Sequence, residues 1–265
     1  MHRLTNICSL FRNYTLQDTS MNLQHAIDWQ NKGKLFVSLA AHPGKTGETF
    51  YNTLFEYHGI DAEYVACACT DLAADMKLVR AYCAGASITM PFKREVAQYT
   101  DSKIIGPINT VLNTDGVLTA YNCDLLGLSD AVAKNFKGLH VVILGDGAMS
   151  ENVLALCKDT TVTQVSRRKD NWHLRNMQCD MLINTTSIGM NRDEYPVAYI
   201  DANVVVDCVI GDTALIRKAR TIGARTVSGA EIYLAQFKHQ FKIYTGIEPD
   251  PAVTAEIAKR VFAYV

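Results

Sequence analysis

The sequence predicts an α/β protein with two domains: an N-terminal α/β domain built on a parallel sheet, and a second, doubly wound α/β domain. From Lys34 onward, short apolar runs typical of strands alternate with amphipathic helical patterns, which is the order that parallel sheets with crossover helices require. Further along, an apolar strand at 139–144 leads directly into a glycine-rich turn and another helix. A chain of 265 residues, 48% of them hydrophobic, is long enough to bury two modest cores.

The first domain is expected to alternate strands with helices. The expected strands are 35–40, 63–69 and 86–90, and the expected helices are 50–58 and 72–82. The first helix ends at Gly59, a residue that readily adopts the left-handed conformation common after a helix, and Pro91 closes the third strand. Because strands and helices alternate, we expect these strands to pair in parallel.

The glycine-rich turn follows Leu139–Leu144, a run rich in Val and Ile that is typical of a strand buried on both faces. The turn reads Gly145-Asp146-Gly147-Ala148-Met149-Ser150, and a helical pattern begins at Val153. This order is the context of a dinucleotide site, because the first glycine permits a tight turn, the second admits a pyrophosphate, and the helix N-terminus favours an anion. The third small position is Ser150 rather than glycine, and on its own this string also fits an ordinary strand-to-helix turn.

The next strand, 161–165, decides between these interpretations because it ends in Ser166-Arg167-Arg168-Lys169. An NAD site has an acidic residue about twenty residues beyond the glycines, for the ribose 2′-hydroxyl, whereas an NADP site has cations there for the 2′-phosphate. Arginine binds a phosphate through two parallel N–H groups, so Arg167 and Arg168 are the expected clamp. The sequence therefore predicts NADP(H) as the cofactor.

Composition argues against several classes of function. The formal net charge is −1 and the basic residues are dispersed apart from 167–169, so no nucleic-acid partner is expected. No apolar run is long enough to cross a bilayer. The eight cysteines include no CxxC pair, which favours a reducing cytoplasm, and the seven histidines show no ligand spacing, so no metal is expected. Residues 1–33 are expected to be an N-terminal extension, to which no function is assigned.

Three polar segments, 87–93, 108–111 and 121–127, are expected at the carboxyl edge of the first sheet, where open α/β sheets bind ligands. Lys93 stands just past a strand end and Asp124 at a helix start. From the residues alone, Asp124 also fits an N-cap and Lys93 a solvated lysine.

The order of these segments resembles the shikimate dehydrogenase family over residues 34 to the C-terminus. The matching motifs are TMPFK at 89–93, INT at 108–110, YNCD at 121–124, GDGAMS at 145–150, INTTSIGM at 183–190, Gly229, QFKHQF at 236–241 and YTG at 244–246. The resemblance implies a substrate-binding domain at 34–122 that the chain enters again at 230–265, with a Rossmann NADP-binding domain at 123–229 between them.

The resemblance also implies roles for individual residues. Lys93 and Asp124 would form the catalytic pair, with Lys93 giving a proton to a ketone oxygen as NADPH delivers hydride to the carbon, a contribution of about 10²–10⁴-fold. Thr89, Asn109 and Gln236 would contact the substrate. The residues expected to bind the cofactor are Gly145, Asp146, Gly147, Ala148, Met149, Ser166, Arg167, Arg168, Thr185, Ser187, Met190, Val209 and Gly229.

The stretch 39–52 departs from the family pattern, in which two serines spaced one apart bind the substrate carboxylate. No serine pair is present, Glu48 would repel a carboxylate that it faced, and Lys45 and Thr46 are partial substitutes. The family's Tyr-x-Pro after the strand ending at Asp207 is replaced by Ile-Gly-Asp at 210–212. The stretch is similar to that of the divergent shikimate dehydrogenase-like branch. Because this stretch lacks the binding site for a substrate carboxylate, it predicts a reductase of a polyhydroxylated ketone, such as the keto-sugar 5-keto-fructose.

Two alternatives stay open at this point. The first is a shikimate or quinate dehydrogenase that uses Lys45 and Thr46 in place of the serines. The second belongs to another class, a non-catalytic NADP-binding sensor, against which the retained Lys93 and Asp124 argue. We expect a small-molecule substrate, a monomer or homodimer, and a cytoplasmic location.

Overall fold

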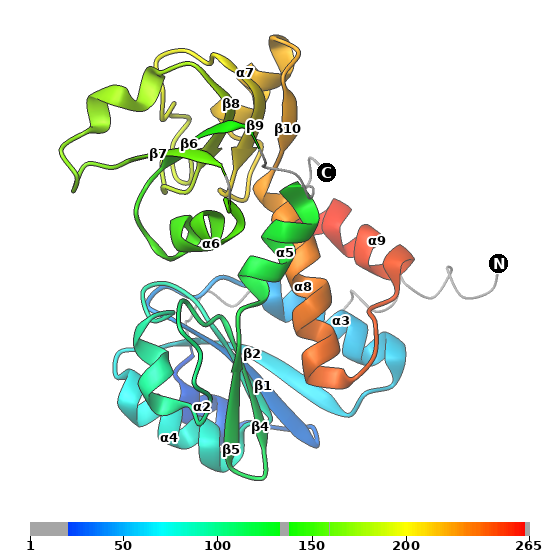
Figure 1. Ribbon diagram of the computed structural model, residues 1–265. Helices are drawn as coiled ribbons and strands as arrows, with labels where there is room; N and C mark the ends of the chain where they lie inside the picture. The colour runs from blue at the N-terminus through cyan, green and yellow to red at the C-terminus, as the bar shows by residue number, and fades with distance from the viewer. Residues whose placement is uncertain (1–20, 133–137, 159, 263–265) are drawn as a thin grey trace. The chain divides into compact units, whose positions relative to one another are not determined.

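The computed structural model describes residues 21–132, 138–158 and 160–262 (Figure 1). The described residues divide into two compact units. The first contains the residues up to Asn122 together with those from Gln240 onward, and the second contains Cys123–His239. Each unit has its own five-stranded sheet, so the expected α/β class with two sheets is confirmed. The expected domain ranges stay a prediction; they place the return of the chain at residue 230, whereas the first unit resumes at Gln240.

The sheet of the first unit has the order β2-β1-β3-β4-β5. Its strands are β1 (Lys34–Ala40), β2 (Ala62–Ala68), β3 (Gly85–Ile88), β4 (Thr110–Thr114) and β5 (Val117–Tyr121). The first three pair in parallel, as predicted, but β4 runs antiparallel to both β3 and β5. The expectation of a parallel sheet is therefore incomplete. Only Asp115 and Gly116 join β4 to β5, and a connection this short permits only antiparallel pairing.

Helices cover both faces of this mixed sheet (Figure 1). They are α2 (Leu23–Asp28), α3 (Thr46–His58), α4 (Leu72–Tyr82), the 3₁₀ helix η2 (Glu95–Tyr99), the last residues of α8 (Gly229–Thr245), and α9 (Pro251–Phe262). On one face, Val37 and Leu39 of β1 belong to a core cluster with Leu23 of α2 and Met76 of α4. On the other, the ring of Phe36 lies 4.8 Å from that of Tyr244.

Part of the segment expected to be an N-terminal extension belongs to this core. Helix α2 begins after Asn22, whose side chain accepts a hydrogen bond from the backbone N–H of His25, and Leu23 and Ala26 are buried. Met21 forms an isolated parallel bridge with Cys67 of β2. The remainder of the expected extension, residues 1–20, lies outside the described residues.

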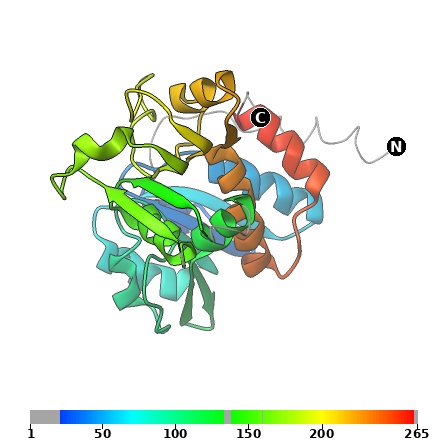
Figure 2. The same ribbon diagram turned by 45° about the horizontal axis from the view of Figure 1, so that its top comes forward.

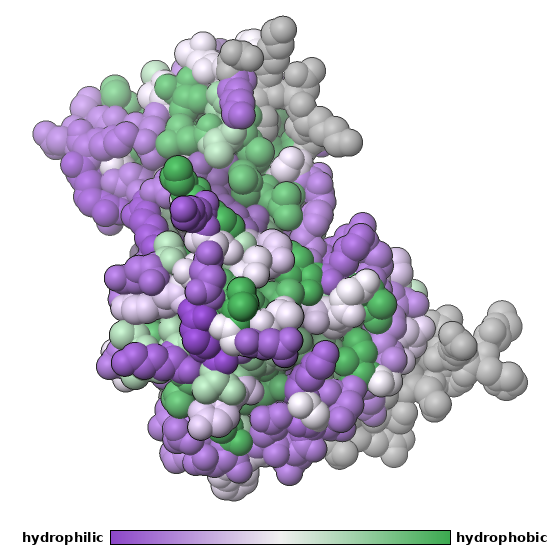
Figure 3. Space-filling model, turned by 60° about the horizontal axis from the view of Figure 1, so that its bottom comes forward, coloured by the Kyte–Doolittle hydropathy of each residue, from purple (hydrophilic) through white to green (hydrophobic). Residues whose placement is uncertain are grey.

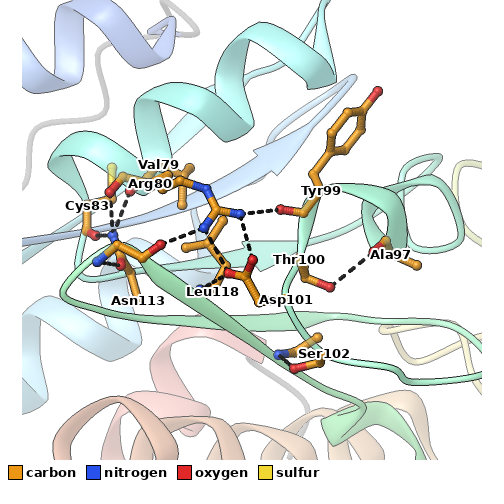
Figure 4. Close-up of polar contacts among 12 residues, drawn as sticks. Val79, Arg80, Cys83, Ala97, Tyr99, Thr100, Asp101, Ser102, Asn113 and Leu118 are labelled. Atoms are coloured by element: carbon orange, nitrogen blue, oxygen red, sulfur yellow. Dashed lines mark hydrogen bonds and ion pairs between the residues drawn. The ribbon is translucent and has the colours of Figure 1, made fainter.

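A polar cluster ties α4 to the β4–β5 hairpin (Figure 4). The side-chain amide of Asn113 donates to the carbonyl oxygens of Val79, Arg80 and Cys83, at 2.8–3.0 Å. The guanidinium of Arg80 donates to the carboxylate of Asp101 at 2.8 Å. The bonds from Asn113 give additional partners to carbonyls at the end of α4, so they fix the hairpin against the helix.

The sheet of the second unit is parallel throughout, with the order β10-β9-β8-β6-β7. Its strands are β6 (His140–Leu144), β7 (Thr161–Val165), β8 (Cys179–Asn184), β9 (Ala202–Asp207) and β10 (Arg225–Val227). Val141 and Ile143 face one core cluster, and Val142 and Leu144 face another, so β6 is buried on both faces. Its neighbours are β7 on one side and β8 on the other, which makes β6 part of the topological switch point where doubly wound sheets bind ligands.

The helices of this unit are α5 (Cys123–Val132), α6 (Ala148–Leu156), η3 (Trp172–Asn176), α7 (Ala214–Thr221) and the first part of α8. Figure 2 shows the yellow-green segment that follows β7 and contains η3 at the edge of the unit. This segment carries the basic residues that the sequence singles out.

The surface is mixed in character. On the face in Figure 3, hydrophobic side chains are interspersed with hydrophilic ones. Within the described part of the chain, no helix is both long enough and apolar enough to cross a membrane.

Candidate functional site

The glycine turn at the end of β6 adopts a conformation that only glycine accepts easily. Gly145 has φ of +112°, in the region that L side chains rarely adopt. A Cβ atom on Gly145 would lie 2.5 Å from Oγ1 of Thr185, which itself donates to the carbonyl oxygen of Leu144 at 2.6 Å. Both the backbone angle and the close approach of the segment after β8 therefore require glycine here.

The N-terminus of α6 is open at the second glycine. Gly147 is the N-cap and has no side chain to cap the helix, and a Cβ atom built on it would meet nothing within 4 Å. Ala148 and Met149 are the first two residues of α6. Because the first N–H groups of a helix have no intrahelical partner and carry a positive dipole, this open end suits a phosphate group. The residues present therefore fit the pyrophosphate of a dinucleotide.

The serine at the third small position has a structural role. Ser150 is fully buried, donates to the carbonyl oxygen of Gly147 at 2.7 Å and accepts from the side-chain amide of Gln164 of β7 at 3.2 Å. It thus joins the first turn of α6 to the neighbouring strand. Glycine at this position would allow the same close packing but would lose both bonds.

The loop after β7 is shaped by its own polar side chains. Asn171 accepts from the backbone N–H of buried Ser166 at 2.9 Å and donates to the carbonyl oxygen of Gln164 at 2.9 Å. The guanidinium carbon of Arg167 lies 5.3 Å from the ring centroid of Trp172, close enough for a cation–π interaction. Arg175 also lies over that ring, at 5.4 Å. The sequence analysis did not identify Trp172 as a partner of the predicted clamp.

The second arginine of the clamp has a carboxylate partner. Arg168 donates to Oδ1 of Asp146 through Nη2 at 2.6 Å and through Nε at 3.1 Å. Ser166 donates to Oδ2 of the same carboxylate at 3.0 Å. Asp146 therefore links the glycine turn to the loop after β7, and the structure brings Asp146, Ser166 and Arg168 together.

The other predicted cofactor residues lie just after β8 and β9, except for Gly229, which is the first residue of α8. Ser187 and Met190 form part of the turn after β8, where the N–H of Met190 donates to the carbonyl oxygen of Ser187 at 3.1 Å. Val209 is buried, and a Cβ atom on Gly229 would lie 2.2 Å from its carbonyl oxygen. Glycine at 229 is therefore required for packing, whatever its role toward a cofactor.

A pocket of about 380 Å³ opens between the segments that follow β8 and β9. It is lined by Gly189, Met190, Asn191, Arg192, Asp193, Ile210, Gly211, Asp212, Thr213 and Arg217. Met190 is the one predicted cofactor residue in this lining. Arg217 pairs there with Asp193 and Asp212, so its charge joins the two segments.

A buried carboxylate holds the end of β9 in place. Asp207 accepts from the side-chain amide of Asn184 at 2.9 Å and from the hydroxyl of Thr213, the N-cap of α7, at 2.6 Å. Burial raises the pKa of Asp207 from its ordinary value. Asp207 therefore joins the end of β9 to β8 and to the start of α7.

Two predicted residues of catalysis and substrate binding also belong to the second unit. Asp124 is 7% exposed and lies in the first turn of α5, where the helix dipole favours an anion. Gln236 lies on α8, and a Cβ atom on Gly127 would come within 2.4 Å of its backbone nitrogen. Glycine at 127 therefore allows α5 to pack directly against α8.

The remaining predicted residues belong to the first unit. Lys93 lies in the turn after β3, and its carbonyl oxygen accepts from the N–H of Ile108 at 2.7 Å. Thr89 directly follows β3 and donates its N–H to the carbonyl oxygen of Leu39. The segments 89–93 and 108–110 are thus adjacent at the carboxyl edge of β1 and β3, as predicted. Whether Lys93 and Asp124 act as a pair stays a prediction.

A buried network that the sequence analysis missed orients Asn109. The hydroxyl of Tyr51 donates to Oε1 of Gln240 at 2.7 Å, and Nε2 of Gln240 donates to the hydroxyl oxygen of Thr110 at 2.7 Å and to the carbonyl oxygen of Asn109 at 3.1 Å. The hydroxyl of Thr110 in turn donates to Oδ1 of Asn109 at 2.9 Å. Because Oδ1 accepts this bond, the network orients the side-chain amide of Asn109.

An ion pair lies at the start of α3, in the stretch where the family pattern has two serines. Lys45 is the N-cap of α3 and Thr46 is its first residue, which places Thr46 in the helix. Nζ of Lys45 lies 3.1 Å from Oε2 of Glu48, and Oε1 of Glu48 accepts from the backbone N–H of Ala66 at 2.7 Å. Glu48 is therefore bound to the protein itself. Its bonds to β2 were not foreseen from sequence.

In residues 21–132, 138–158 and 160–262, no group of three or more His, Cys, Asp or Glu side chains is arranged to hold a metal ion.

Together, these features define a two-domain α/β protein whose second unit has the parallel sheet and glycine turn of a Rossmann-like dinucleotide-binding domain. Residues 48–111 match the family model described as the shikimate dehydrogenase substrate binding domain. A shikimate dehydrogenase-like protein of Haemophilus influenzae is 31% identical over 258 residues, covering 85% of this chain and 95% of the relative. The chain belongs to the shikimate dehydrogenase family of oxidoreductases.

Other relatives agree with this assignment. A shikimate dehydrogenase (NADP(+)) of Pyrococcus abyssi is 29% identical over 241 residues, covering 80% of this chain and 90% of the relative. A solved shikimate 5-dehydrogenase-like protein is 30% identical, with a TM-score of 0.76 over 86% of this chain and 97% of that one. The ligand-free 5-ketofructose reductase of Gluconobacter sp. shares the fold at 23% identity, with a TM-score of 0.74 over 88% of this chain and 100% of that one.

Proposed function

We propose that this protein is an NADP(H)-dependent oxidoreductase that transfers hydride between NADPH and the carbonyl group of a polyhydroxylated ketone lacking a carboxylate. The observation that carries the substrate part is the Lys45–Glu48 ion pair, at 3.1 Å, where the family pattern has two serines. A carboxylate substrate would have to compete with Glu48 for Lys45. A neutral substrate meets no such competition.

The cofactor part rests on the glycine turn and the basic loop. The open N-terminus of α6 at Gly147 suits a pyrophosphate, and Arg167 and Arg168 stand where an NADP site has its cations. Relatives that are named shikimate dehydrogenase (NADP(+)) support the same cofactor. When bound, NADPH supplies the hydride.

The proton chemistry is assigned to Lys93 and Asp124. As the carbonyl oxygen of the substrate gains negative charge, the ammonium group of Lys93 gives it a proton, and in the oxidation direction the neutral amine takes that proton back. Asp124 holds the ammonium group toward the substrate. Asn109 contacts a substrate hydroxyl through its side-chain amide, which the bond from Thr110 orients. Thr89 and Gln236 complete the proposed substrate contacts.

The second candidate is reduction of 3-dehydroshikimate to shikimate, which the names of the relatives favour. In that case Lys45, whose side chain is 41% exposed, would exchange Glu48 for the substrate carboxylate, with Thr46 assisting. The two candidates differ in the charge of the substrate that this segment accepts.

Initial rates of NADPH oxidation with 5-keto-fructose and with 3-dehydroshikimate, measured side by side, test the proposal. We expect faster turnover of the keto-sugar, and Thr46→Val should leave that rate within about twofold. If 3-dehydroshikimate is turned over faster and Thr46→Val abolishes that activity, the proposal of a neutral substrate is overturned. Binding of NADPH without turnover in a broad panel of keto-sugars and cyclic polyol ketones would favour a sensor over an enzyme.

The cofactor assignment has its own test. Replacing Arg167 and Arg168 together by Ala should weaken NADPH binding by about tenfold or more while changing NADH binding little, because the lost guanidinium groups would bind the 2′-phosphate, which NADH lacks. Arg225→Ala, an exposed arginine at the start of β10, is the matched control. Equal losses for both cofactors would show that the clamp is misplaced. Fluorescence titration of the reduced cofactors gives both affinities.

A further inference from the structure

The acidic residue of an NAD site is absent after β7, but a carboxylate reaches the same place from another element. At the end of β7 the chain has Ser166, and the carboxylate of Asp146, from the glycine turn, accepts its hydroxyl at 3.0 Å. An acid at the end of this strand binds the ribose 2′-hydroxyl in NAD sites. We infer that Asp146 takes over that role and competes with the 2′-phosphate of NADP(H) for Arg168. This competition lowers the preference of the site for NADP(H) over NAD(H).

The contacts of Arg168 support this competition. Both Nε and Nη2 of Arg168 bind Oδ1 of Asp146, at 3.1 and 2.6 Å, which is the kind of contact that a phosphate oxygen would make. The side chain of Arg168 is 74% exposed, so it is free to rotate toward a ligand, whereas that of Asp146 is 21% exposed. The Nε–Nη2 edge of Arg168, which can bind a phosphate through two parallel N–H groups, is thus engaged by Asp146, and a 2′-phosphate that takes this edge has to displace the carboxylate.

The charge of Asp146 acts in the same direction. A phosphate monoester carries about −1.5 to −2 charges near neutral pH. A carboxylate held against Ser166 lies beside the place where that phosphate would bind, and like charges a few ångströms apart repel each other even at an effective dielectric constant of about 20. The 2′-hydroxyl of NAD(H) instead meets a hydrogen-bond acceptor. Asp146 therefore favours NAD(H) and disfavours NADP(H).

The position of Asp146 is well defined in the structure. Its carboxylate is held by Ser166, which is 3% exposed, and the loop that contains Ser166 is fixed by Asn171. The preceding Gly145 is restricted by its backbone angle and by Thr185. The carboxylate of Asp146 thus lies between two constrained segments of the same unit. The role inferred for Asp146 rests on the proposed cofactor, NADP(H).

Calorimetric titration with 2′,5′-ADP and with 5′-ADP tests the inference without any substrate or turnover. Asp146→Asn keeps an oxygen acceptor for Arg168 and removes the charge. We expect it to bind 2′,5′-ADP about fivefold more tightly or better than the native chain does, and 5′-ADP with an affinity that is unchanged or weaker. Asp170→Asn, which removes the same charge from the loop after β7, is the matched control and should change both affinities by less than about twofold.

Each other outcome has a definite meaning. Unchanged or weaker binding of 2′,5′-ADP by Asp146→Asn overturns the inference while leaving the proposed cofactor intact, because Asp146 would then only position Arg168. The native chain gives a second measurement that does not depend on the variant folding. We expect its preference for 2′,5′-ADP over 5′-ADP to be below about a hundredfold, and a preference above a thousandfold overturns the inference. If the native chain binds neither nucleotide, the proposed function and this inference fail together.

Discussion

The two compact units hold their polar groups in different ways. In the second unit, the glycine turn depends on backbone geometry within a short stretch, such as the positive φ of Gly145 and the open N-cap at Gly147. In the first unit, Asn109 is oriented by Gln240, which is 131 residues away in sequence, and Gln240 in turn contacts Tyr51, 189 residues away.

This difference separates two kinds of site. A pyrophosphate is bound mostly by backbone N–H groups. Its binding site therefore depends on glycines, which let the phosphate approach the backbone, more than on particular side chains. Hydroxyl groups on a substrate are bound by side-chain amides, which have to be held in one orientation by further side chains. Changes in the second unit should therefore act through the backbone, and changes in the first through networks.

The largest effect should come from a side chain of the first unit. Lys93→Met keeps much of the shape of the side chain but removes its proton, so we expect turnover to fall by about 10²–10⁴-fold with little change in NADPH affinity. Lys103→Met, at an exposed lysine of the same unit, is the control. Steady-state rates and cofactor titration measure both quantities. If Lys93→Met also lost NADPH binding, proton transfer and cofactor binding would not be divided between the two units as proposed.

A pair of glycine substitutions sharpens the comparison within the second unit. Gly145→Ala has to place a Cβ atom 2.5 Å from Thr185 at φ of +112°, so we expect a loss of stability of about 2 kcal/mol or more. Gly147→Ala meets nothing within 4 Å and should keep its stability within about 1 kcal/mol, while its methyl group weakens NADPH binding. Urea unfolding and NADPH titration distinguish the two. Equal stability of both variants would contradict the backbone argument.

The buried network of the first unit predicts a smaller effect. Gln240→Leu leaves the hydroxyl of Tyr51 without its acceptor and releases Thr110, so we expect a destabilisation of about 1–3 kcal/mol. Because Asn109 would lose its fixed orientation, KM for the substrate should rise by about tenfold with a smaller change in kcat. Gln24→Leu, at an exposed glutamine of α2, is the control. A fall in kcat with constant KM would count against a positioning role.

The smallest effect is expected at the ion pair between Arg80 of α4 and Asp101, which lies in the segment after η2. The hydrogen bonds from Arg80 and from the N–H of Leu118 hold the pKa of Asp101 below its ordinary value of 3.8. A lowered folded-state pKa contributes stability that is fully present above the unfolded value and is lost as the pH falls through the folded value. The difference in urea midpoint between the native chain and Asp101→Asn should therefore be constant near neutral pH and shrink below pH 3.8. A difference that grows in acid would reverse the sign of this coupling.

Some elements were predictable from sequence and others were not identified. The helix at 72–82 matches α4, and the strand at 161–165 matches β7. The hairpin of β4 and β5 was missed although its turn, Asp115-Gly116, is a common hairpin turn in which both residues have positive φ. The start of α3 at Thr46 lies four residues before the predicted one, because Thr46 and Gly47 have no apolar face that marks them as helical.

The sequence by itself determined the class of fold, the glycine turn, the basic loop and the resemblance to the shikimate dehydrogenase family. These features are local, because they depend on residue types at fixed short spacings. A phosphate site formed by backbone groups can be recognised from such spacings. Only the tertiary structure decided which charges neutralise each other. The pair Arg168–Asp146, the bond from the N–H of Ala66 to Glu48 and the bond from Gln240 to Thr110 join groups whose meeting depends on how the strands pair and the helices pack. No local pattern encodes these partners, and the pair Arg168–Asp146 is the contact from which we infer the choice of cofactor.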